Sequence, residues 1–268
     1  MSSRRGTGPE NAGRIDMTPD PTKYYERYVD RYSRIYAQGV SYWTGNPDEV
    51  GAVLRSVDEF LSYAKATPAS ASVVEFGCGE GFLGEHLLAK GYSYLGIDIA
   101  PSALAKARAR AGGKASAFML GDVTRLIEVR SDSFTVALDN YCLHMLVTDE
   151  DRKRCLSEIE RVLTPGGHAW FHEIGQATPF TETIHSLEQF LAAHPIDLDA
   201  CEAREAFTPG GKRTVQIPRL PARFNNGEGY RREIESSGLK VDLVEARDSG
   251  IVVYARKAGV PHPPAHRE

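Results

Sequence analysis

One glycine-rich stretch carries most of the information about architecture: Val73-Val74-Glu75-Phe76-Gly77-Cys78-Gly79-Glu80-Gly81. A run of strand-forming residues ends in three alternate glycines, and an apolar helical segment begins directly after them. Glycine permits positive φ and leaves bare backbone against which a ligand can lie, and the start of a helix offers unpaired N–H groups. Seventeen residues past Gly81, a second apolar strand ends in Asp98, whose carboxylate can accept hydrogen bonds from both vicinal hydroxyls of a ribose.

Strands and helices alternate outward from this stretch. Periodicity predicts strands at 72–76, 93–97, 117–120, 134–138 and 168–174, and helices at 82–90, 101–111 and 149–163. Such βαβ alternation is typical of a mostly parallel sheet covered by helices on both faces. Right-handed crossovers place the loops that follow the strands at one edge, where open α/β sheets bind ligands.

The flanking segments depart from this rhythm. A helix is expected over 21–38, where tyrosines recur every four residues, either as a packing face or as a lid over a ligand. A second helix should begin at Pro47 behind an Asn46 cap. The insert 176–224 is too long for a plain connection and is interpreted as an acceptor-side cap, with a helix at 181–193 and a short strand at 213–217. A helix at 226–237 and strands at 239–246 and 250–257 should close the chain.

Composition excludes several classes of protein. The 268 residues carry 32 Lys+Arg against 36 Asp+Glu, a net charge of −4, which argues against a nucleic-acid binder held mainly by phosphate contacts. An apolar run long enough for a membrane span is absent from the sequence. The four cysteines are widely spaced and form no Cys-x-x-Cys, so a zinc knot is not expected and a cytoplasmic setting is the simplest interpretation. Residues 1–20 and 259–268 are expected to be a disordered leader and tail.

A nicotinamide site is the competing interpretation of the glycine stretch. Gly79-Glu80-Gly81-Phe82-Leu83-Gly84 satisfies G-x-G-x-x-G, which is a weak signal alone. Counted from the strand end at Gly77, however, the third fingerprint position is Phe82, which would obstruct close packing of helix on strand. Glu75 is also awkward beside a pyrophosphate but welcome beside a cationic ligand. The stretch therefore favours a positively charged nucleoside without phosphates.

With these motifs the sequence resembles the class I S-adenosylmethionine-dependent methyltransferases. Besides the glycine stretch, the matching segments are Gly96-Ile97-Asp98-Ile99, Leu120-Gly121-Asp122-Val123, the run from Phe134 to His144, and Arg161-Val162-Leu163-Thr164-Pro165-Gly166-Gly167-His168. The resemblance implies a Rossmann-like, three-layer α/β/α fold with a seven-stranded, mostly parallel sheet whose last strand is antiparallel. It implies a helical lid over 21–66 and a donor-binding domain over 67–258. Thr135 departs from the Asp often found there in the family, which affects the register of that strand.

Site residues follow from the resemblance position by position. The donor, S-adenosylmethionine, would be bound by Glu75, Gly77, Cys78, Gly79, Gly81, Asp98, Ile99, Asp122, Val123, Asn140 and Tyr141. Aromatic residues could wall the acceptor site, namely Tyr28, Tyr32, Tyr42 and Trp43. His144 is the first candidate base, with His172 and Glu173 facing the same edge. No complete metal-ligand set is visible.

The sequence thus predicts a methyltransferase acting on N or O of a small molecule, in specialised metabolism, as a monomer or homodimer. Two alternatives remain open. A protein or RNA substrate would need an open cleft, and a non-catalytic binder of the donor would act through partner contacts. His144 and the Tyr and Trp residues can equally serve as structural packing.

Overall fold

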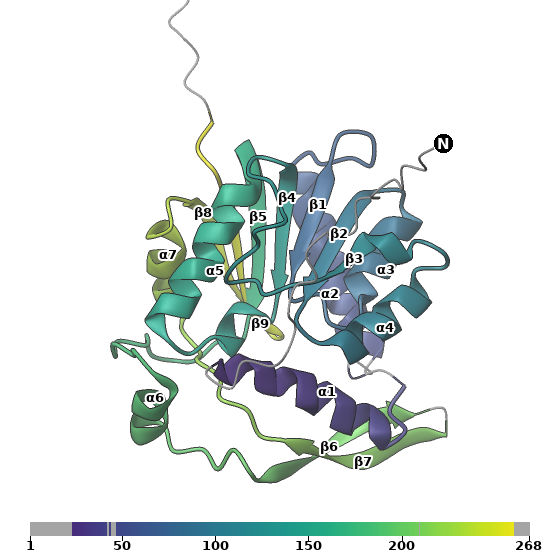
Figure 1. Ribbon diagram of the computed structural model, residues 1–268. Coiled ribbons are helices and arrows are strands. Elements are labelled where there is room, and N and C mark those ends of the chain that lie inside the picture. The colour runs from purple at the N-terminus through teal and green to yellow at the C-terminus, as the bar shows by residue number, and fades with distance from the viewer. Residues whose placement is uncertain (1–22, 42, 44–46, 209, 260–268) are drawn as a thin grey trace, which may run out of the picture.

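The computed structural model describes residues 23–41, 43, 47–208 and 210–259. A seven-stranded sheet in the order β3-β2-β1-β4-β5-β9-β8 forms its centre (Figure 1). The strands are β1 (Ser72–Phe76), β2 (Ser93–Asp98), β3 (Phe118–Leu120), β4 (Phe134–Asn140), β5 (Leu163–Glu173), β8 (Lys240–Arg247) and β9 (Gly250–Arg256). Only β9 runs antiparallel to its neighbours, β5 and β8. The predicted Rossmann-like fold with an antiparallel last strand is confirmed.

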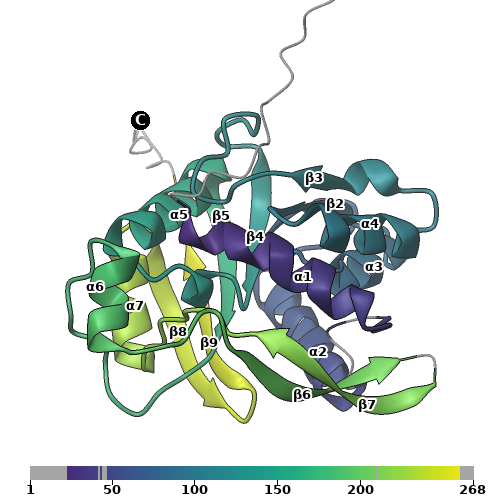
Figure 2. The ribbon, with the colours of Figure 1, turned by 60° about the horizontal axis from the view of Figure 1, so that its bottom comes forward.

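Two helical layers cover the sheet (Figures 1 and 2). One layer consists of α2 (Pro47–Tyr63), α3 (Phe82–Ala89) and α4 (Pro101–Arg110), and the other of α5 (Asp149–Val162) and α7 (Gly227–Glu235). Successive side chains of a strand point to opposite faces of the sheet, so each strand contributes to both layers. Val73 packs in the cluster that contains α2, α3 and α4, and Val74 packs in the cluster that contains α5 and α7. This two-sided burial explains why the neighbouring residues Val73 and Val74 of β1 are both apolar.

A third body lies across the carboxyl ends of the parallel strands (Figure 2). It combines η1 (Tyr24–Glu26) and α1 (Arg27–Ala37) with a hairpin of β6 (Cys201–Thr208) and β7 (Gly211–Pro218). Ile35 of α1 is fully buried against Val215 and Ile217 of β7. The side-chain amide of Gln38 donates to the carbonyl of Gln216 at 2.6 Å and accepts from its N–H at 2.9 Å. The N-terminal helix and the insert therefore pack on each other as one cap.

The insert is where sequence periodicity was least accurate. The predicted helix 181–193 is wrong in its first half, because only α6 (Leu187–Ala193) is helical. Ile184 instead exchanges hydrogen bonds with Asp149, its N–H donating to Oδ2 at 3.0 Å and its carbonyl accepting from the Asp149 N–H at 2.8 Å. Ser186 then caps α6 through the N–H of Gln189. The predicted strand 213–217 is the core of β7, and its partner β6 was not predicted.

Several predictions fall on residues outside the described ranges: the leader 1–20, the Asn46 cap, Tyr42, and the tail beyond residue 259. Within the described ranges, no helix combines the length and apolar character required to cross a membrane.

Candidate functional site

A cavity of about 120 Å³ lies between the carboxyl edge of the sheet and the α1 cap. The sheet edge contributes Gly77, Asp98, Ile99, Gly121, Asp122, Val123, Tyr141, Cys142, Met145 and Leu146. The cap contributes Tyr25, Tyr28, Arg31, Tyr32, Ile35 and Trp43. The cavity thus lies at the switch point where β1 has β2 on one side and β4 on the other, which is where open α/β sheets bind ligands.

The glycine turn after β1 presents bare backbone to this cavity. Gly77, Gly79 and Gly81 have φ of 68°, 51° and 72°, a region that L side chains rarely adopt. A Cβ on Gly77 would lie 2.6 Å from Sγ of Cys142, and one on Gly79 would lie 2.8 Å from the hydroxyl of Tyr32. Of the turn's residues only Gly77 lines the cavity, whereas Cys78, Gly79 and Gly81 pack behind it. A side chain at Gly77 or Gly79 would therefore displace Cys142 or Tyr32, both of which line the cavity.

Asp98 is held rigidly at the end of β2. Its Oδ2 accepts from the N–H of Gly79 at 2.7 Å and its Oδ1 from the N–H of Ala100 at 2.8 Å. Burial raises the pKa of the carboxyl against the lowering effect of these bonds. Asp98 and the neighbouring Ile99 both line the cavity. Each carboxylate oxygen retains a lone pair, so the group can still accept hydrogen bonds from a ligand diol.

Asp122 forms the opposite end of the cavity and is bonded to the cap. Lys23 donates to Oδ2 at 2.7 Å and the hydroxyl of Tyr25 donates to the same oxygen at 3.0 Å. Thr124 donates to Oδ1 from its N–H at 2.9 Å and its hydroxyl at 2.7 Å. Burial would raise the pKa of Asp122, but the bonds from Lys23 and Thr124 outweigh burial and lower it. Asp122 is therefore an anion that both the cap and a ligand amino group can use.

The cap is also tied down over the glycine turn. Glu80 is buried, and its Oε1 accepts from the hydroxyl of Tyr36 at 2.8 Å and from the N–H of Trp43 at 2.5 Å. The guanidinium of Arg31 lies 5.3 Å from the centre of the Trp43 ring. The predicted aromatic residues Tyr28, Tyr32 and Trp43 thus face the donor-side residues across the cavity.

Behind the cavity wall lies a buried acidic cluster around His144. The Nδ1 of His144 is 2.5 Å from Oε2 of Glu173, and Glu173 also accepts from the N–H groups of Leu143 and His144, each at 3.1 Å. Burial lowers the pKa of His144 and raises the pKa of both Glu173 and Asp139. A proton on Asp139 gives its otherwise unpartnered Oδ2 a hydrogen to donate toward Glu173. Glu173 therefore fixes the imidazole as the neutral Nδ1–H tautomer, and Nε2 remains without a partner in the described structure.

His172 supports a different part of the wall. Its Nδ1 is 3.1 Å from Oδ1 of Asn140, and its Nε2 is 3.1 Å from the hydroxyl of Tyr141 and 3.0 Å from that of Ser249. Burial lowers the pKa of His172 to about 4. Tyr141 has a φ of 62°, uncommon for a residue with a side chain, and lines the cavity. His172 and Asn140 thus hold a strained Tyr141 in place.

The predicted site residues divide into two groups. Those that line the cavity are Tyr28, Tyr32, Trp43, Gly77, Asp98, Ile99, Asp122, Val123 and Tyr141. Those that do not are Glu75, Cys78, Gly79, Gly81, Asn140, His144, His172 and Glu173. Strand alternation turns Glu75 away from the cavity lining. Its side chain points into the layer of α3 and accepts from the hydroxyl of Tyr94, and burial raises its pKa to about 8.

Several lining residues were not predicted from sequence, namely Tyr25, Arg31, Ile35, Gly121, Cys142, Met145 and Leu146. Arg31 lies on the helix face between Tyr28 and Tyr32, so the four-residue tyrosine repeat contained a signal for it. Met145 and Leu146 lie in and just after a 3₁₀ turn, η3 (Leu143–Met145), and carried no such signal.

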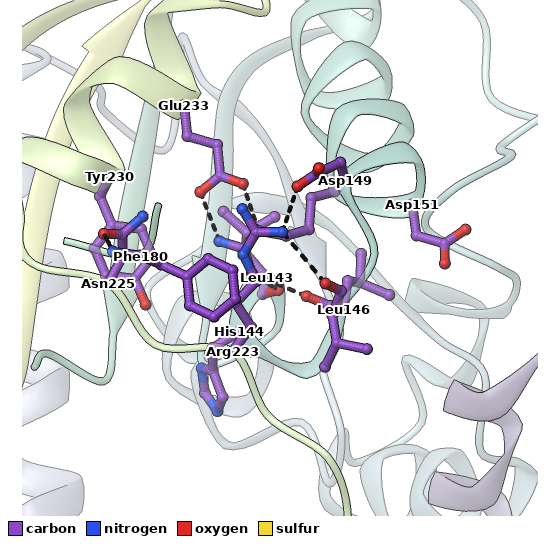
Figure 3. A network of polar contacts seen from close by, with 12 residues as sticks. Leu143, His144, Leu146, Asp149, Asp151, Phe180, Arg223, Asn225, Tyr230 and Glu233 are labelled. Carbon is purple, nitrogen blue, oxygen red and sulfur yellow. Dashed lines mark hydrogen bonds and ion pairs between the residues drawn. The ribbon is translucent and has the colours of Figure 1, made fainter. Parts of the chain in front are cut away.

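On the side away from the cavity, buried arginine side chains donate hydrogen bonds to the segment 143–147, which forms part of the cavity wall (Figure 3). Arg152 of α5 is fully buried and donates from Nη1 to the carbonyls of Leu143 at 2.7 Å and Leu146 at 3.0 Å. Its Nε and Nη2 form two bonds to the carboxylate of Glu233 on α7. Because Leu146 lines the cavity, Arg152 connects the cavity wall to both helices of that layer. Within the described ranges, no three His, Cys, Asp or Glu side chains gather as a metal site would require.

Residues 74–171 match a family model described as a methyltransferase domain. An uncharacterized methyltransferase of Schizosaccharomyces pombe is 26% identical over 179 residues, which cover 66% of this chain and 62% of the relative. A malonyl-[acyl-carrier protein] O-methyltransferase of Serratia marcescens is 28% identical over 234 residues, 84% of this chain and 85% of the relative. For the first three relatives the match spans 62%, 49% and 51% of the relative's length, less than two thirds.

Solved structures share the fold over most of the chain. The [4+2]-cyclase SpnF aligns over 91% of this chain and 100% of its own, with a TM-score of 0.59 and 14% identity. The CcbJ methyltransferase of Streptomyces caelestis covers 90% and 100%, with a TM-score of 0.57 and 18% identity. The 1,6-didemethyltoxoflavin-N1-methyltransferase of Burkholderia thailandensis, solved with 1,6-didemethyltoxoflavin and S-adenosylhomocysteine bound, covers 87% of both chains, with a TM-score of 0.54 and 18% identity. At these identities the likeness establishes the fold.

Proposed function

Because the chain belongs to the class I S-adenosylmethionine-dependent methyltransferase family, in which S-adenosylmethionine is the methyl donor, we propose that it binds this donor under α1 and methylates an oxygen or nitrogen atom of a compact small molecule. One observation carries the proposal. Asp98, Asp122 and the bare backbone of Gly77 line a single cavity at the carboxyl edge of the sheet. Two carboxylates line this cavity against a single lining cation, Arg31, which suits a nucleoside that carries positive charge.

The residues present fit the donor in chemistry. Asp98 would accept from the ribose hydroxyls, Asp122 from the adenine amino group, and Ile99 and Val123 would flank the ring, as the family resemblance implies. The cavity of about 120 Å³ is smaller than the ~300–1,000 Å³ of ordinary ligand sites. The side chains of Tyr28 and Tyr32 of α1 occupy space that the donor would need, so we infer that the cap moves outward to admit it.

The donor supplies a methyl group on a positively charged sulfur, which is already activated for displacement. The protein's task is then to align the acceptor and exclude water, and good alignment is worth ~7–11 kcal/mol. Tyr28, Tyr141 and Trp43 line the cavity together with Gly77 of the glycine turn. Their aromatic faces favour a cation near them, and the cap above them keeps water out.

A hydroxyl or protonated amine acceptor must also lose a proton. His144 is the candidate base, because its imidazole is neutral, Glu173 holds the Nδ1 hydrogen, and Nε2 is free to accept. His144 does not line the cavity, so this role requires the acceptor to reach past Cys142. Glu173 and His172 would then act as positioning residues for His144 and Tyr141.

An enclosed cavity favours a compact acceptor over a protein or RNA chain, which would need an open cleft. Among the relatives, a ubiquinone biosynthesis O-methyltransferase points the same way, whereas the names of two others specify a malonyl-[acyl-carrier protein] acceptor. All four cysteines are free, which supports the cytoplasmic setting we propose. A monomer or a homodimer is compatible with this site.

The direct test has two stages. Calorimetry should give tight binding of S-adenosylhomocysteine and none of NAD, and Asp98→Ala should abolish tight binding. Metabolite pools incubated with isotopically labelled S-adenosylmethionine should then yield a labelled product by mass analysis, and product formation should be lost in His144→Ala. Donor binding without any labelled product would support the alternative of a non-catalytic binder. Turnover by His144→Ala near the wild-type rate would exclude His144 as the base.

A further inference from the structure

A second hollow, of about 500 Å³, lies outside the cavity wall between α5, α7 and the two ends of the insert. Its lining residues are Asp149, Lys153, Leu156, Phe180, Thr181, Arg223, Asn225, Gly229, Arg232, Glu233 and Ser236. Figure 3 shows the polar network at its base, with Phe180, Arg223 and Glu233 converging. The proposed methyl transfer uses none of these residues.

The carboxylates of the groove are already neutralised by protein groups. Both oxygens of Glu233 are bonded to Arg152. In Asp149, Oδ1 accepts from Nη1 of Arg223 and Oδ2 from the N–H of Ile184. These bonds leave neither carboxylate available to neutralise the cations at the rim.

The two cations at the rim of the groove, Lys153 and Arg232, have no such partners. Lys153 and Arg232 are both exposed, and in the described part of the chain neither side chain has a hydrogen-bond or ion-pair partner. The groove therefore carries two uncompensated positive charges on a protein whose net charge is −4. A concave surface of this kind concentrates anions.

Arg223 supplies an independent sign of a missing hydrogen-bond acceptor. It is 7% exposed, and its Nε–H has no hydrogen-bond partner within the described structure. Its guanidinium lies 4.2 Å from the centre of the Phe180 ring, which holds it in place at the base of the groove. A buried donor left without a partner costs ~1–3 kcal/mol, so a ligand that accepts from it is favoured.

We propose that this groove binds a phosphate group carried by a small molecule. Lys153 and Arg232 would supply the opposing charge, and Arg223 a charge-assisted hydrogen bond at the base. A phosphate fits better than a carboxylate because one carboxylate needs only one guanidinium, whereas three cations and the hydroxyls of Thr181 and Ser236 border this groove. The site is independent of the methyl-transfer proposal.

Pyrophosphate titrated calorimetrically into the full-length protein, with the first cavity saturated by S-adenosylhomocysteine, tests the site. Wild-type protein should bind one pyrophosphate per chain. The double variant Lys153→Gln/Arg232→Gln should bind at least tenfold more weakly. Lys240→Gln/Arg219→Gln is the matched control, because it removes the same charge from exposed residues that do not line the groove, and it should change affinity less than twofold.

Three results would overturn the proposal: no binding by wild-type protein, equal loss in both double variants, or acetate binding as tightly as pyrophosphate at equal ionic strength. Amide shifts in an NMR titration give a second readout that does not depend on the variants. They should be centred on Thr181, Asn225 and Gly229, and shifts centred on Gly77 and Asp122 would move the anion to the first cavity and refute the site.

Discussion

Replacing Arg152 with methionine should be among the most destabilising single changes outside the apolar core. The guanidinium is fully buried, bonds both oxygens of Glu233 and accounts for bonds to two carbonyls of the cavity wall. Removing one partner of a buried ion pair costs ~3–5 kcal/mol because the other charge is left uncompensated. The Glu233 side chain is 16% exposed and can regain some water, so we expect about 3 kcal/mol from this source.

The two carbonyls add to this loss. Leu143 and Leu146 are buried, and an unmade bond to a buried acceptor costs ~1–3 kcal/mol. The sum for Arg152→Met is then about 5 kcal/mol or more, which lowers the melting temperature by at least ~10 °C in a chain of this size. Adding Glu233→Leu removes the stranded carboxylate, so the double variant should be more stable than Arg152→Met alone.

Urea unfolding and calorimetry with S-adenosylhomocysteine provide the measurements. Arg154→Met is the matched control, because Arg154 lies on the same helix and pairs with Glu150 at side-chain exposures of 58% and 61%. That exposed pair should be worth no more than ~0.5 kcal/mol. Affinity for S-adenosylhomocysteine should fall at least threefold in Arg152→Met, since Leu146 lines the cavity, and stay unchanged in Arg154→Met. Equal stability of the two variants would refute the assignment of Arg152 as the support of the wall.

Three further changes test other parts of the molecule. Asp98→Asn should weaken S-adenosylhomocysteine binding at least tenfold by calorimetry, and unchanged affinity would remove Asp98 from the site. Burial raises the pKa of Glu75 from its ordinary 4.5 to about 8, so its contribution to stability is complete below pH ~4.5 and is lost as pH rises to ~8. The free energy of unfolding of Glu75→Gln, measured in urea, should therefore rise by up to about 5 kcal/mol relative to wild type between pH 5 and 9. A difference that does not depend on pH would contradict this. Gly81→Ala should cost about 3 kcal/mol, because φ is +72° and its Cβ would lie 2.7 Å from Cβ of Ala107. Gly166→Ala, with φ +80° and no atom within 4 Å, should show only the backbone cost of ~1 kcal/mol, and equal losses would mean that packing at Gly81 is unimportant.

The sheet could be predicted because its signals are local. The central strands β1, β4 and β9 are buried on both faces and read as short, mostly apolar runs. The observed β1 has the bounds that the sequence predicts, and α2 begins at Pro47 as expected. The glycine turn and Asp98 could be predicted equally well, because each lies at the end of a strand and the carboxyl ends of parallel strands share one edge of the sheet.

The cap shows where local signals fail. β6 was missed because its sequence, CEAREAFT, is mostly polar and only Ala206 is fully buried, against α1 and β7. The helix predicted from residue 181 was shortened because the backbone of Ile184 bonds both the side chain and the N–H of Asp149. In both cases the deciding partner is distant in sequence, and an apolar pattern cannot reveal it.

The candidate base illustrates the same limit at the site. The sequence places His144 just past β4, at the open edge, and that position is where the structure has it. The carboxylate that holds it belongs to Glu173, at the end of the neighbouring strand, and both are buried. The sequence could therefore predict that His144 lies near the edge of the sheet. It could not predict that the imidazole is buried, because this burial depends on the packing of η3 against Arg152.

The contacts of Asp122 link the cap to the donor. In the present structure its Oδ2 accepts from Lys23 and Tyr25, both at the start of the cap. The family resemblance assigns this carboxylate to the adenine edge, and the cavity is too small for a donor while the tyrosines of α1 fill it. On the proposed function a donor and the cap would share the carboxylate of Asp122, so we expect the bonds from Lys23 and Tyr25 to loosen as the donor enters. Since β7 packs on α1 through Ile35 and Gln38, the hairpin of the insert must move with the helix. We therefore propose that the acceptor space is bounded by a body that donor binding repositions, with the insert acting as part of the catalytic unit.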